Sequence, residues 1–198
     1  QELLESHGIT IHGNDELERF EGEETVAKVI TRGGTELAAD AVVIGAGVSP
    51  DVQLAQRAGL ELGERGGVLC NSRLESSVPG VYAAGDICEY ESVIHGGAHM
   101  RIEHWDNAAD MGPHAARTLL ADAAGGTGDP YEPIPWFWSD QYDRKIQLAG
   151  RARADDDVAV VAGSLEDRRF VVFFGRGGRL VGVLGMSMPA KVMRWLAL

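Results

Sequence analysis

The sequence predicts an α/β region followed by a separate, strand-rich α+β module. Short apolar strands alternate with helical patterns and glycine turns as far as residues 121–130, which have the Ala-, Gly-, Asp- and Thr-rich composition of a linker. Beyond this linker, strand patterns follow one another closely, as in an antiparallel sheet. The net charge changes at the same place, from −14 over residues 1–130 to +2 over residues 131–198. We therefore expect two modules with different surfaces.

The first part of the α/β region contains a hairpin pattern and a buried-strand pattern. Residues 26–31 have strand composition, residues 32–35 contain the glycines of a tight turn, and residues 36–38 begin the return strand. Residues 41–44 are a continuous apolar run, which is typical of a strand buried on both faces. Residues 52–58 fit a short helix closed by a glycine.

The rest of the α/β region combines short strands with one long helix. Strands are expected at residues 68–69 and 81–84, and a helix over residues 106–121. Pro113 lies inside this helix and predicts a kink or a later start, because proline lacks the N–H and clashes with the preceding turn. The expected apolar stripe of the helix consists of Ala108, Met111, Ala115 and Leu119.

The C-terminal module is rich in hairpin signals. Residues 175–178 form a glycine-rich turn between two strands, and Pro189 opens a short helix. The four predicted strands cover residues 146–149, 158–162, 170–174 and 180–184.

Composition limits the classes of function. Of the 198 residues, 44% are hydrophobic and 24% charged, as in a globular protein with a core. No apolar run approaches the ~20 residues that span a membrane, and no signal-peptide pattern is present. We therefore expect a cytoplasmic protein without a membrane partner. The acidic first 130 residues argue against a nucleic-acid partner.

Cysteine and histidine spacing indicates neither a redox-active disulfide nor a metal site. The only cysteines, Cys70 and Cys88, form no CxxC pair, so reduced thiols are expected. The histidines His95, His99 and His104 lie within ten residues of one another, but their spacing does not match a helical pair of metal ligands.

The segment at residues 81–86, VYAAGD, is the most informative motif. An apolar strand leads to Gly85, where a ligand can approach the backbone, and then to the carboxylate of Asp86. The end of a strand in an α/β sheet is a common ligand site. A hydroxyl-rich ligand, such as a sugar or a ribityl chain, would suit this arrangement. The alternative is an ordinary Gly-Asp turn.

A glycine-rich stretch follows the apolar run at residues 41–44. Residues 45–50, GAGVSP, superficially resemble the dinucleotide fingerprint GxGxxG, but Pro50 replaces the third glycine and the acidic residue expected further on is absent. We favour a glycine-lined crossover, including Gly47, where the chain passes close to a bound cofactor.

Residues 101–108, RIEHWDNA, place Glu103, His104 and Trp105 just before a helix. The N–H groups at a helix start favour a developing anion, such as the N1–C2=O edge of a reduced flavin. The alternative is an ordinary N-cap, Asp106 or Asn107, beside a core tryptophan.

Residues 134–142 form an aromatic segment that contains Trp136. Such a cluster is a core element, a subunit interface or a pocket wall, with the core as the default expectation.

These motifs occur in the order found in a known family. Residues 40–51 resemble the DxVVxGxGxxPN stretch of the two-dinucleotide flavoprotein reductases, and residues 81–86 resemble their second FAD motif. Residues 101–108 resemble a segment of apoptosis-inducing-factor-like proteins. Residues 135–142, PWFWSDQY, resemble the start of the C-terminal domain in the ferredoxin and rubredoxin reductases. The chain thus resembles the C-terminal part of an FAD-dependent pyridine nucleotide-disulfide oxidoreductase of that branch.

The resemblance implies partial, Rossmann-like FAD/NAD(P)-binding domains followed by an α+β reductase domain. Residues 1–48 would complete the NAD(P)-binding domain, residues 49–122 the FAD-binding domain, and residues 131–198 would form the reductase or dimerisation domain. Asp86 would bind the flavin ribityl chain. The cofactor-binding residues implied by the family are Gly47, Pro50, Gly85, Asp86, Glu103, His104, Trp105 and Trp136, with no catalytic side chain and no metal.

The implied chemistry is electron transfer from NAD(P)H through FAD to a ferredoxin- or rubredoxin-like iron–sulfur protein. Neither GxGxxG phosphate loop of the family occurs in this sequence. We therefore read the chain as a C-terminal fragment that alone is inactive and binds neither nucleotide tightly. The alternative function is a non-catalytic binding or dimerisation module that retains the fold.

Overall fold

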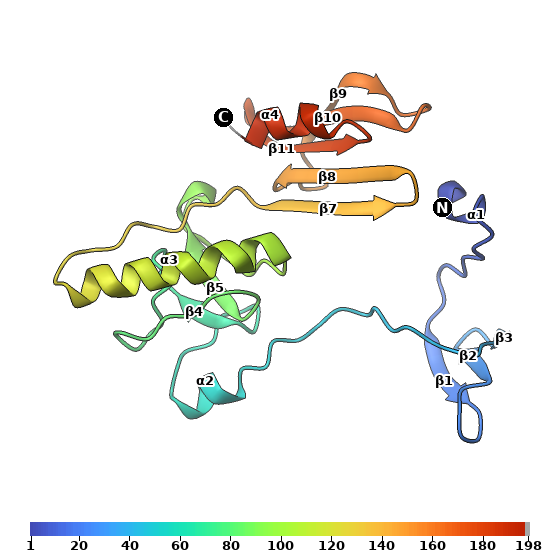
Figure 1. Ribbon diagram of the computed structural model, residues 1–198, viewed down its shortest axis with the longest axis horizontal. Helices are drawn as coiled ribbons and strands as arrows, with labels where there is room; N and C mark the ends of the chain where they lie inside the picture. The colour runs from blue at the N-terminus through green and yellow to red at the C-terminus, as the bar shows by residue number, and fades with distance from the viewer. Residues whose placement is uncertain (197–198) are drawn as a thin grey trace. The chain divides into compact units, whose positions relative to one another are not determined.

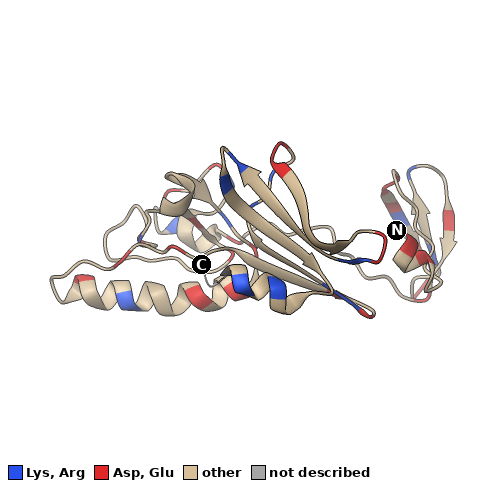
Figure 2. Cartoon of the chain, turned by 90° about the horizontal axis from the view of Figure 1, so that it is seen from above, with Lys and Arg blue, Asp and Glu red and all other residues tan. Residues whose placement is uncertain are grey.

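The structure is a computed structural model that describes residues 1–196, without the side chain of Leu196. The chain divides into two compact units, Gln1–Val48 and Ser49–Leu198, which are described separately (Figure 1). Acidic and basic positions are interspersed over the C-terminal unit (Figure 2). No helix among the described residues is long and apolar enough to cross a membrane.

The N-terminal unit is a small antiparallel sheet preceded by a one-turn helix. The strands pair in the order β1-β2-β3, and the predicted turn at residues 32–35 joins β2 to β3. Asp15 fixes this turn, since its Oδ1 accepts a hydrogen bond of 2.9 Å from the backbone N–H of Gly33. The sequence patterns did not predict β1. The elements are α1 (Glu2–Glu5), β1 (Leu17–Glu21), β2 (Lys28–Thr31) and β3 (Glu36–Ala38).

The prediction of a buried strand at residues 41–44 is wrong. This segment has no regular secondary structure, and the exposed fractions are 96% for Val43 and 65% for Ile44. A strand buried on both faces needs neighbouring strands and covering helices, and no described strand pairs with this segment.

The C-terminal unit begins with a mixed sheet and its helices. Strand β4 runs parallel to β5, and β5 pairs antiparallel with β6. The predicted helix at residues 52–58 is confirmed. The long helix begins at Trp105, so Pro113 does not delay its start. The elements are α2 (Gln53–Arg57), β4 (Val68–Cys70), β5 (Cys88–Ser92), the 3₁₀ turn Val93–His95, β6 (Ala98–Met100) and α3 (Trp105–Ala123).

The predicted strand at residues 81–84 is also wrong. Its only ladder contact in the described chain is an isolated bridge between Tyr82 and Glu75. Gly85 and Asp86 follow in a turn that leads into β5, so the motif precedes a strand and does not end one. Residues 81–83 pair with residues 74–76 through only two backbone hydrogen bonds, from the N–H of Ser76 to the oxygen of Val81 at 2.8 Å and from the N–H of Ala83 to the oxygen of Leu74 at 3.1 Å, which is too short a pairing for a strand.

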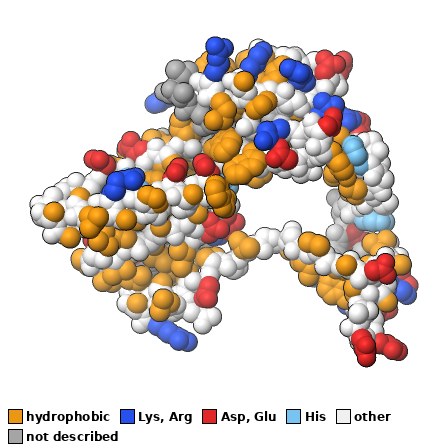
Figure 3. Space-filling model, in the orientation of Figure 1, with side chains coloured by type: hydrophobic (Ala, Val, Ile, Leu, Met, Phe, Trp, Pro, Cys, Tyr) orange, Lys and Arg blue, Asp and Glu red, His pale blue; other side chains and the backbone are white. Residues whose placement is uncertain are grey.

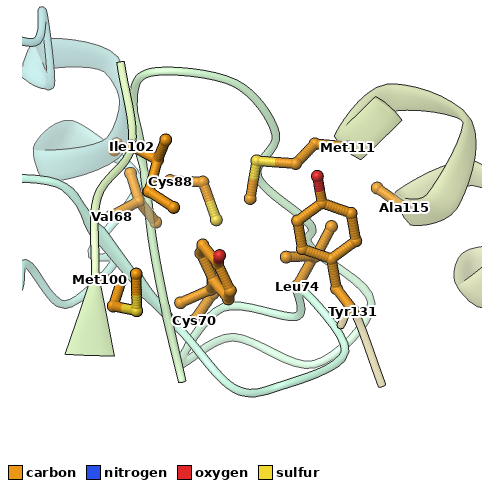
Figure 4. Close-up of a cluster of buried hydrophobic side chains, with 11 residues drawn as sticks. Val68, Cys70, Leu74, Cys88, Met100, Ile102, Met111, Ala115 and Tyr131 are labelled. Atoms are coloured by element: carbon orange, nitrogen blue, oxygen red, sulfur yellow. The ribbon is translucent and has the colours of Figure 1, made fainter. Parts of the chain in front are cut away.

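The core of this part lies between α3 and the mixed sheet (Figure 4). Helix α3 contributes Met111 and Ala115, as the stripe predicted, but Leu119 is 42% exposed and the neighbouring Thr118 is buried instead. Cys70 and Cys88 are free thiols within this core. The labelled side chains in Figure 4 are Val68, Cys70, Leu74, Cys88, Met100, Ile102, Met111, Ala115 and Tyr131.

The last part of the unit is a five-stranded antiparallel sheet in the order β7-β8-β11-β10-β9, with α4 packed on β8 and β11. All four predicted strands, the glycine turn at residues 175–178 and the helix at Pro189 are confirmed. The aromatic segment forms the edge strand β7, which the patterns did not predict. The elements are β7 (Trp136–Gln141), β8 (Arg144–Gly150), β9 (Asp157–Ser164), β10 (Arg169–Arg176), β11 (Arg179–Met186) and α4 (Pro189–Leu196).

Candidate functional site

The Gly85–Asp86 turn lies against the first turn of α3. Gly85 has φ +79°, a conformation that favours glycine, and a Cβ added there would lie 3.6 Å from the Cβ of Ala108. The Asp86 side chain is exposed. Its carboxylate can therefore accept hydrogen bonds from a ligand that lies beside the start of the helix.

Arg101 ties this turn to the residues that precede α3. Its Nη1 donates to the backbone oxygen of Asp86 at 3.2 Å and lies 2.5 Å from Oε1 of Glu103. Its Nε donates to the backbone oxygen of Arg65 at 3.1 Å. The guanidinium of Arg101, whose side chain is 14% exposed, thus holds two predicted site residues, Asp86 and Glu103, next to each other.

The start of α3 has no side-chain cap. His104 is the N-cap residue, with extended backbone (φ −115°, ψ 137°), and its side chain makes no capping hydrogen bond. The expectation that Asp106 or Asn107 caps the helix is wrong, since both lie inside its first turn. Trp105 is 76% exposed and so is not a core residue. The free N–H groups and the helix dipole can stabilise negative charge on a ligand here.

The aromatic side chains of β7 meet the start of α3. Trp105 packs edge-on against Trp138 at a centroid distance of 6.3 Å, and His104 lies 5.6 Å from Phe137. Trp136 stacks on Trp138 at 4.8 Å. Phe137 is 43% exposed, so the aromatic segment forms a surface beside the helix start and not the core that was the default expectation.

Two nitrogens in this group are buried without a hydrogen-bond partner among the described residues. They are Nδ1 of His104 and Nε1 of Trp136. A buried polar atom without a partner costs about 1–3 kcal/mol, and native proteins satisfy nearly all such atoms. The unmet nitrogens fit a site that receives a polar ligand.

The structure brings together six of the eight predicted site residues: Gly85, Asp86, Glu103, His104, Trp105 and Trp136. Gly47 belongs to the N-terminal unit, whereas the six residues belong to the C-terminal unit. Pro50 precedes α2, and no hydrogen bond or ring contact joins it to α3 in the described chain. The list of predicted site residues contains neither Arg101 nor Trp138, although the motif at residues 101–108 begins with Arg101 and the family resemblance places the region from Trp136 to Trp138 near the flavin or the partner face. Residues 136–138 are all aromatic, and Trp136 and Trp138 lie two apart in the strand and so share a face, which is a signal for Trp138.

Two family profiles match the chain. The pyridine nucleotide-disulphide oxidoreductase profile matches residues 1–112, which is more than half of the chain. The reductase C-terminal profile matches residues 136–198. The two matches together follow the order of motifs described above.

Curated relatives agree with the profiles. Rhodocoxin reductase of Rhodococcus erythropolis is 38% identical over 168 residues, which are 84% of this chain and 37% of that protein. Putidaredoxin reductase of Pseudomonas putida is 31% identical over 194 residues, which are 96% of this chain and 44% of that protein. The chain therefore spans less than half the length of these relatives.

Solved structures give the same result. The putidaredoxin reductase in its covalent complex with putidaredoxin matches with a TM-score of 0.87 and 30% identity, over 99% of this chain and 46% of that one. A ferredoxin reductase from Rhodopseudomonas palustris matches with a TM-score of 0.82 and 34% identity, over 94% of this chain and 44% of that one. The family that the sequence motifs predicted is confirmed: the chain belongs to the pyridine nucleotide-disulphide oxidoreductases, a family that uses FAD and NAD(P)H, in the ferredoxin reductase branch with a reductase C-terminal domain.

Proposed function

We propose that this chain carries the flavin-facing part of an FAD-dependent NAD(P)H oxidoreductase whose complete form passes electrons to a ferredoxin- or rubredoxin-like iron–sulfur protein. The observation that carries the proposal is the meeting of the Gly85–Asp86 turn, the uncapped helix start at His104 and the β7 aromatics. The names of the relatives, rhodocoxin reductase and putidaredoxin reductase, support the class of acceptor.

The residues present fit a flavin. The exposed Asp86 carboxylate would accept a hydrogen bond from a ribityl hydroxyl, and the helix start would favour negative charge at one edge of the ring. The buried nitrogens of His104 and Trp136 would gain polar partners. When bound, FAD supplies the hydride acceptance and the single-electron release. The side chains of this site bind and orient it, and the aromatic residues exclude water from one side.

The proposed domain assignment keeps the boundaries expected from the sequence. Residues 1–48 are the end of the NAD(P)-binding domain, residues 49–122 the C-terminal part of the FAD-binding domain, and residues 131–198 the reductase domain. In this assignment Gly47 and Pro50 lie in the crossover between the two nucleotide-binding domains. That position supports a role for their backbone near the cofactor.

The experiment that tests the function uses the complete protein, with the chain joined to the residues encoded upstream of Gln1. We expect a flavin absorbance spectrum, reduction of the flavin by NADH or NADPH, and transfer to ferricyanide and to an iron–sulfur protein. A purified complete protein that is colourless and inactive with both nucleotides would refute the proposal. Flavin reduction without transfer to any iron–sulfur protein would refute only the acceptor class.

A second candidate function, a dimerisation module, is favoured by the free edge strand β9. Val158, Val160 and Val161 are 64%, 47% and 47% exposed on this strand, and an exposed apolar edge is a template for pairing with another chain. Light scattering of the chain without cofactor distinguishes the two functions. A stable dimer would support the module, and a monomer at micromolar concentration would exclude pairing through β9.

A further inference from the structure

A cavity of about 550 Å³ lies in the C-terminal unit between the mixed sheet and the five-stranded sheet. Met100, Phe137 and Leu148 give it an apolar wall. Arg65 and Glu103 on its lining are exposed, so the cavity opens to solvent on that side. Its size is in the range of small-molecule sites, which combine apolar walls with a few polar groups.

Three arginines line this cavity, and only one of them has a carboxylate partner. Arg101 is paired with Glu103 and also donates to two backbone oxygens. Arg65 donates its Nε to the backbone oxygen of His99 at 3.2 Å. No carboxylate lies within ion-pair distance of Arg65 or Arg151 in the described part of the chain. Two positive charges therefore face the cavity without compensation.

The backbone on both sides of the cavity holds these arginines in place. The loop that carries Arg65 is fixed by the buried carboxylate of Glu89, whose Oε2 accepts from the N–H of Arg65 at 3.0 Å and from the N–H of Gly67 at 3.3 Å. The N–H of Arg151 donates to the backbone oxygen of Val181 at 2.8 Å, at the end of β8. The two guanidiniums are thus presented from fixed segments.

Further positive charge surrounds Arg151. Burial lowers the pKa of Arg151, and the guanidiniums of Arg65, Arg153 and Arg176 lower it further. Of these four arginines, Arg176 is neutralised by Asp156: its Nε donates to Oδ1 at 2.6 Å and its Nη2 donates to Oδ2 at 2.8 Å. Like charges held together raise the energy of the folded chain, and an anion bound between Arg65 and Arg151 would offset that cost.

We propose that this cavity binds a small organic anion, with a carboxylate or phosphate group on Arg65 and Arg151 and an apolar ring against Phe137 and Leu148. Guanidinium groups bind both oxyanions through paired, charge-assisted hydrogen bonds. The site goes beyond the proposed electron transfer. It shares Arg101, Glu103, His104 and Phe137 with the proposed flavin site, whereas the Asp86 and tryptophan side chains of that site do not line it.

The test uses the full 198-residue chain labelled with ¹⁵N and four probes in NMR titrations. Benzoate and phenyl phosphate carry both a ring and an oxyanion, benzyl alcohol carries only the ring, and acetate carries only the oxyanion. We expect saturable shifts with the first two probes, centred on the backbone N–H groups of Arg65, Gly150 and Arg151. Benzyl alcohol and acetate should bind at least tenfold more weakly, because each lacks one of the two contacts.

Arginine variants test the charge requirement. Arg151→Gln and Arg65→Gln should each weaken benzoate at least tenfold. The matched control is Arg153→Gln, because Arg153 is exposed and close to Arg151 but does not line the cavity; it should change the affinity less than twofold. Thermal melts check the fold of each variant, and if Arg151→Gln does not fold, Arg65→Gln and the probe comparison decide.

Four results would overturn the proposal. Two concern the probes: benzyl alcohol binds as tightly as benzoate, or benzoate shows no saturable binding up to ~10 mM. The third is unchanged benzoate affinity in folded Arg65→Gln or Arg151→Gln. The fourth is displacement of benzoate by riboflavin, which would make the cavity part of the flavin site. None of these results bears on flavin reduction by NADH in the complete protein, so the two proposals fail independently.

Discussion

Arg101 organises the candidate site through backbone oxygens that are distant in sequence. It joins the oxygens of Arg65 and Asp86 and pairs with Glu103. Arg101 itself is only partly exposed, at 14% of its side chain. The Asp86 carboxylate takes no part in these bonds and remains available, which makes it the residue whose loss should affect a ligand most directly.

For that reason Asp86→Ala in the complete protein should weaken FAD retention. One charge-assisted hydrogen bond contributes about 1.5–3 kcal/mol, which corresponds to a loss of affinity of roughly tenfold or more. The measurement is the flavin-to-protein absorbance ratio after dialysis. The control is Asp110→Ala, an exposed aspartate on α3, which should keep full occupancy. Equal occupancy of the Asp86 variant and the wild type would contradict the role.

The carboxylate of Asp122, near the end of α3, is hydrogen-bonded to Tyr82 in the extended segment before Gly85 and to Arg73. The hydroxyl of Tyr82 donates to Oδ2 of Asp122 at 2.5 Å, and Nη1 of Arg73 donates to Oδ1 of Asp122 at 2.8 Å. The Tyr82 bond, the N–H of Gly128 and Arg73 lower the pKa of Asp122. The same bond raises the pKa of Tyr82 to about 12, so the tyrosine remains a donor.

The low pKa of Asp122 gives its contribution to stability a defined pH dependence. The folded state binds the Asp122 proton more weakly than the unfolded state. Its contribution is therefore complete above the unfolded pKa, about 3.9, and disappears as the pH falls through the lower folded pKa. We expect Asp122→Asn to lower the urea midpoint at pH 7, and the difference from wild type to shrink towards pH 3. A difference independent of pH would contradict this.

At the scale of elements, α4 is held to the five-stranded sheet by close contact at one glycine. A Cβ added to Gly185 of β11 would lie 2.2 Å from Cγ2 of Val192, which is fully buried on α4. Valine is stiff at χ1, so its side chain cannot easily move aside. Glycine at this position sets how closely the helix approaches the sheet.

Gly185→Ala should therefore destabilise the C-terminal sheet by about 1–3 kcal/mol through overpacking. The control is Gly175→Ala, where an added Cβ would have its nearest neighbours at 3.8 Å. Urea unfolding followed by tryptophan fluorescence measures both. The double variant Gly185→Ala/Val192→Ala should lose less free energy of unfolding than the sum of the two single variants, because Val192→Ala removes the methyl group that the new Cβ would meet. Additive costs would show that the contact is not the cause.

The sequence predicts elements whose partners are near in the chain and fails where partners are remote. The strands of the C-terminal sheet are correct because tight turns, such as residues 175–178, join neighbours. Residues 41–44 have strand composition but pair with no described strand, and residues 81–84 pair with residues 74–76 only through an isolated bridge. In the site, Asp86, His104 and Trp105 follow from motifs. Arg101 lies in the motif at residues 101–108, but its role in joining distant segments does not follow from the motif, because its partner Arg65 is 36 residues away.

At the scale of the whole molecule, the chain consists of two units joined by an exposed segment. Residues 41–49 are all exposed and have no regular secondary structure. Apolar side chains also reach the surface among charged ones on the face shown in Figure 3. The exposed fractions of Val43, Ile44 and Val48 are 96%, 65% and 67%, so the last residues of the N-terminal unit form an apolar stretch open to solvent.

Limited proteolysis should cut this stretch first, because proteases favour exposed backbone without hydrogen-bonded structure. We expect a protease specific for aliphatic residues, such as thermolysin or elastase, to give a stable product that begins between residues 42 and 50. Mass spectrometry identifies the cut. An earlier cut within β8, β10 or β11 would contradict the division into units, since those three strands are paired on both sides in the sheet.

The reactivity of the two cysteines can report how often the core of the C-terminal unit opens. Cys70 and Cys88 are 2% and 1% exposed and are the only thiols in the chain. A hydrogen bond with Cys70, together with burial, raises the pKa of Cys88, so its reactive thiolate is suppressed as well as hidden. Alkylation of the folded chain can then proceed only through opening of the packing between α3 and the mixed sheet. The rate of thiol alkylation measures the free energy of that opening, without any engineered residue.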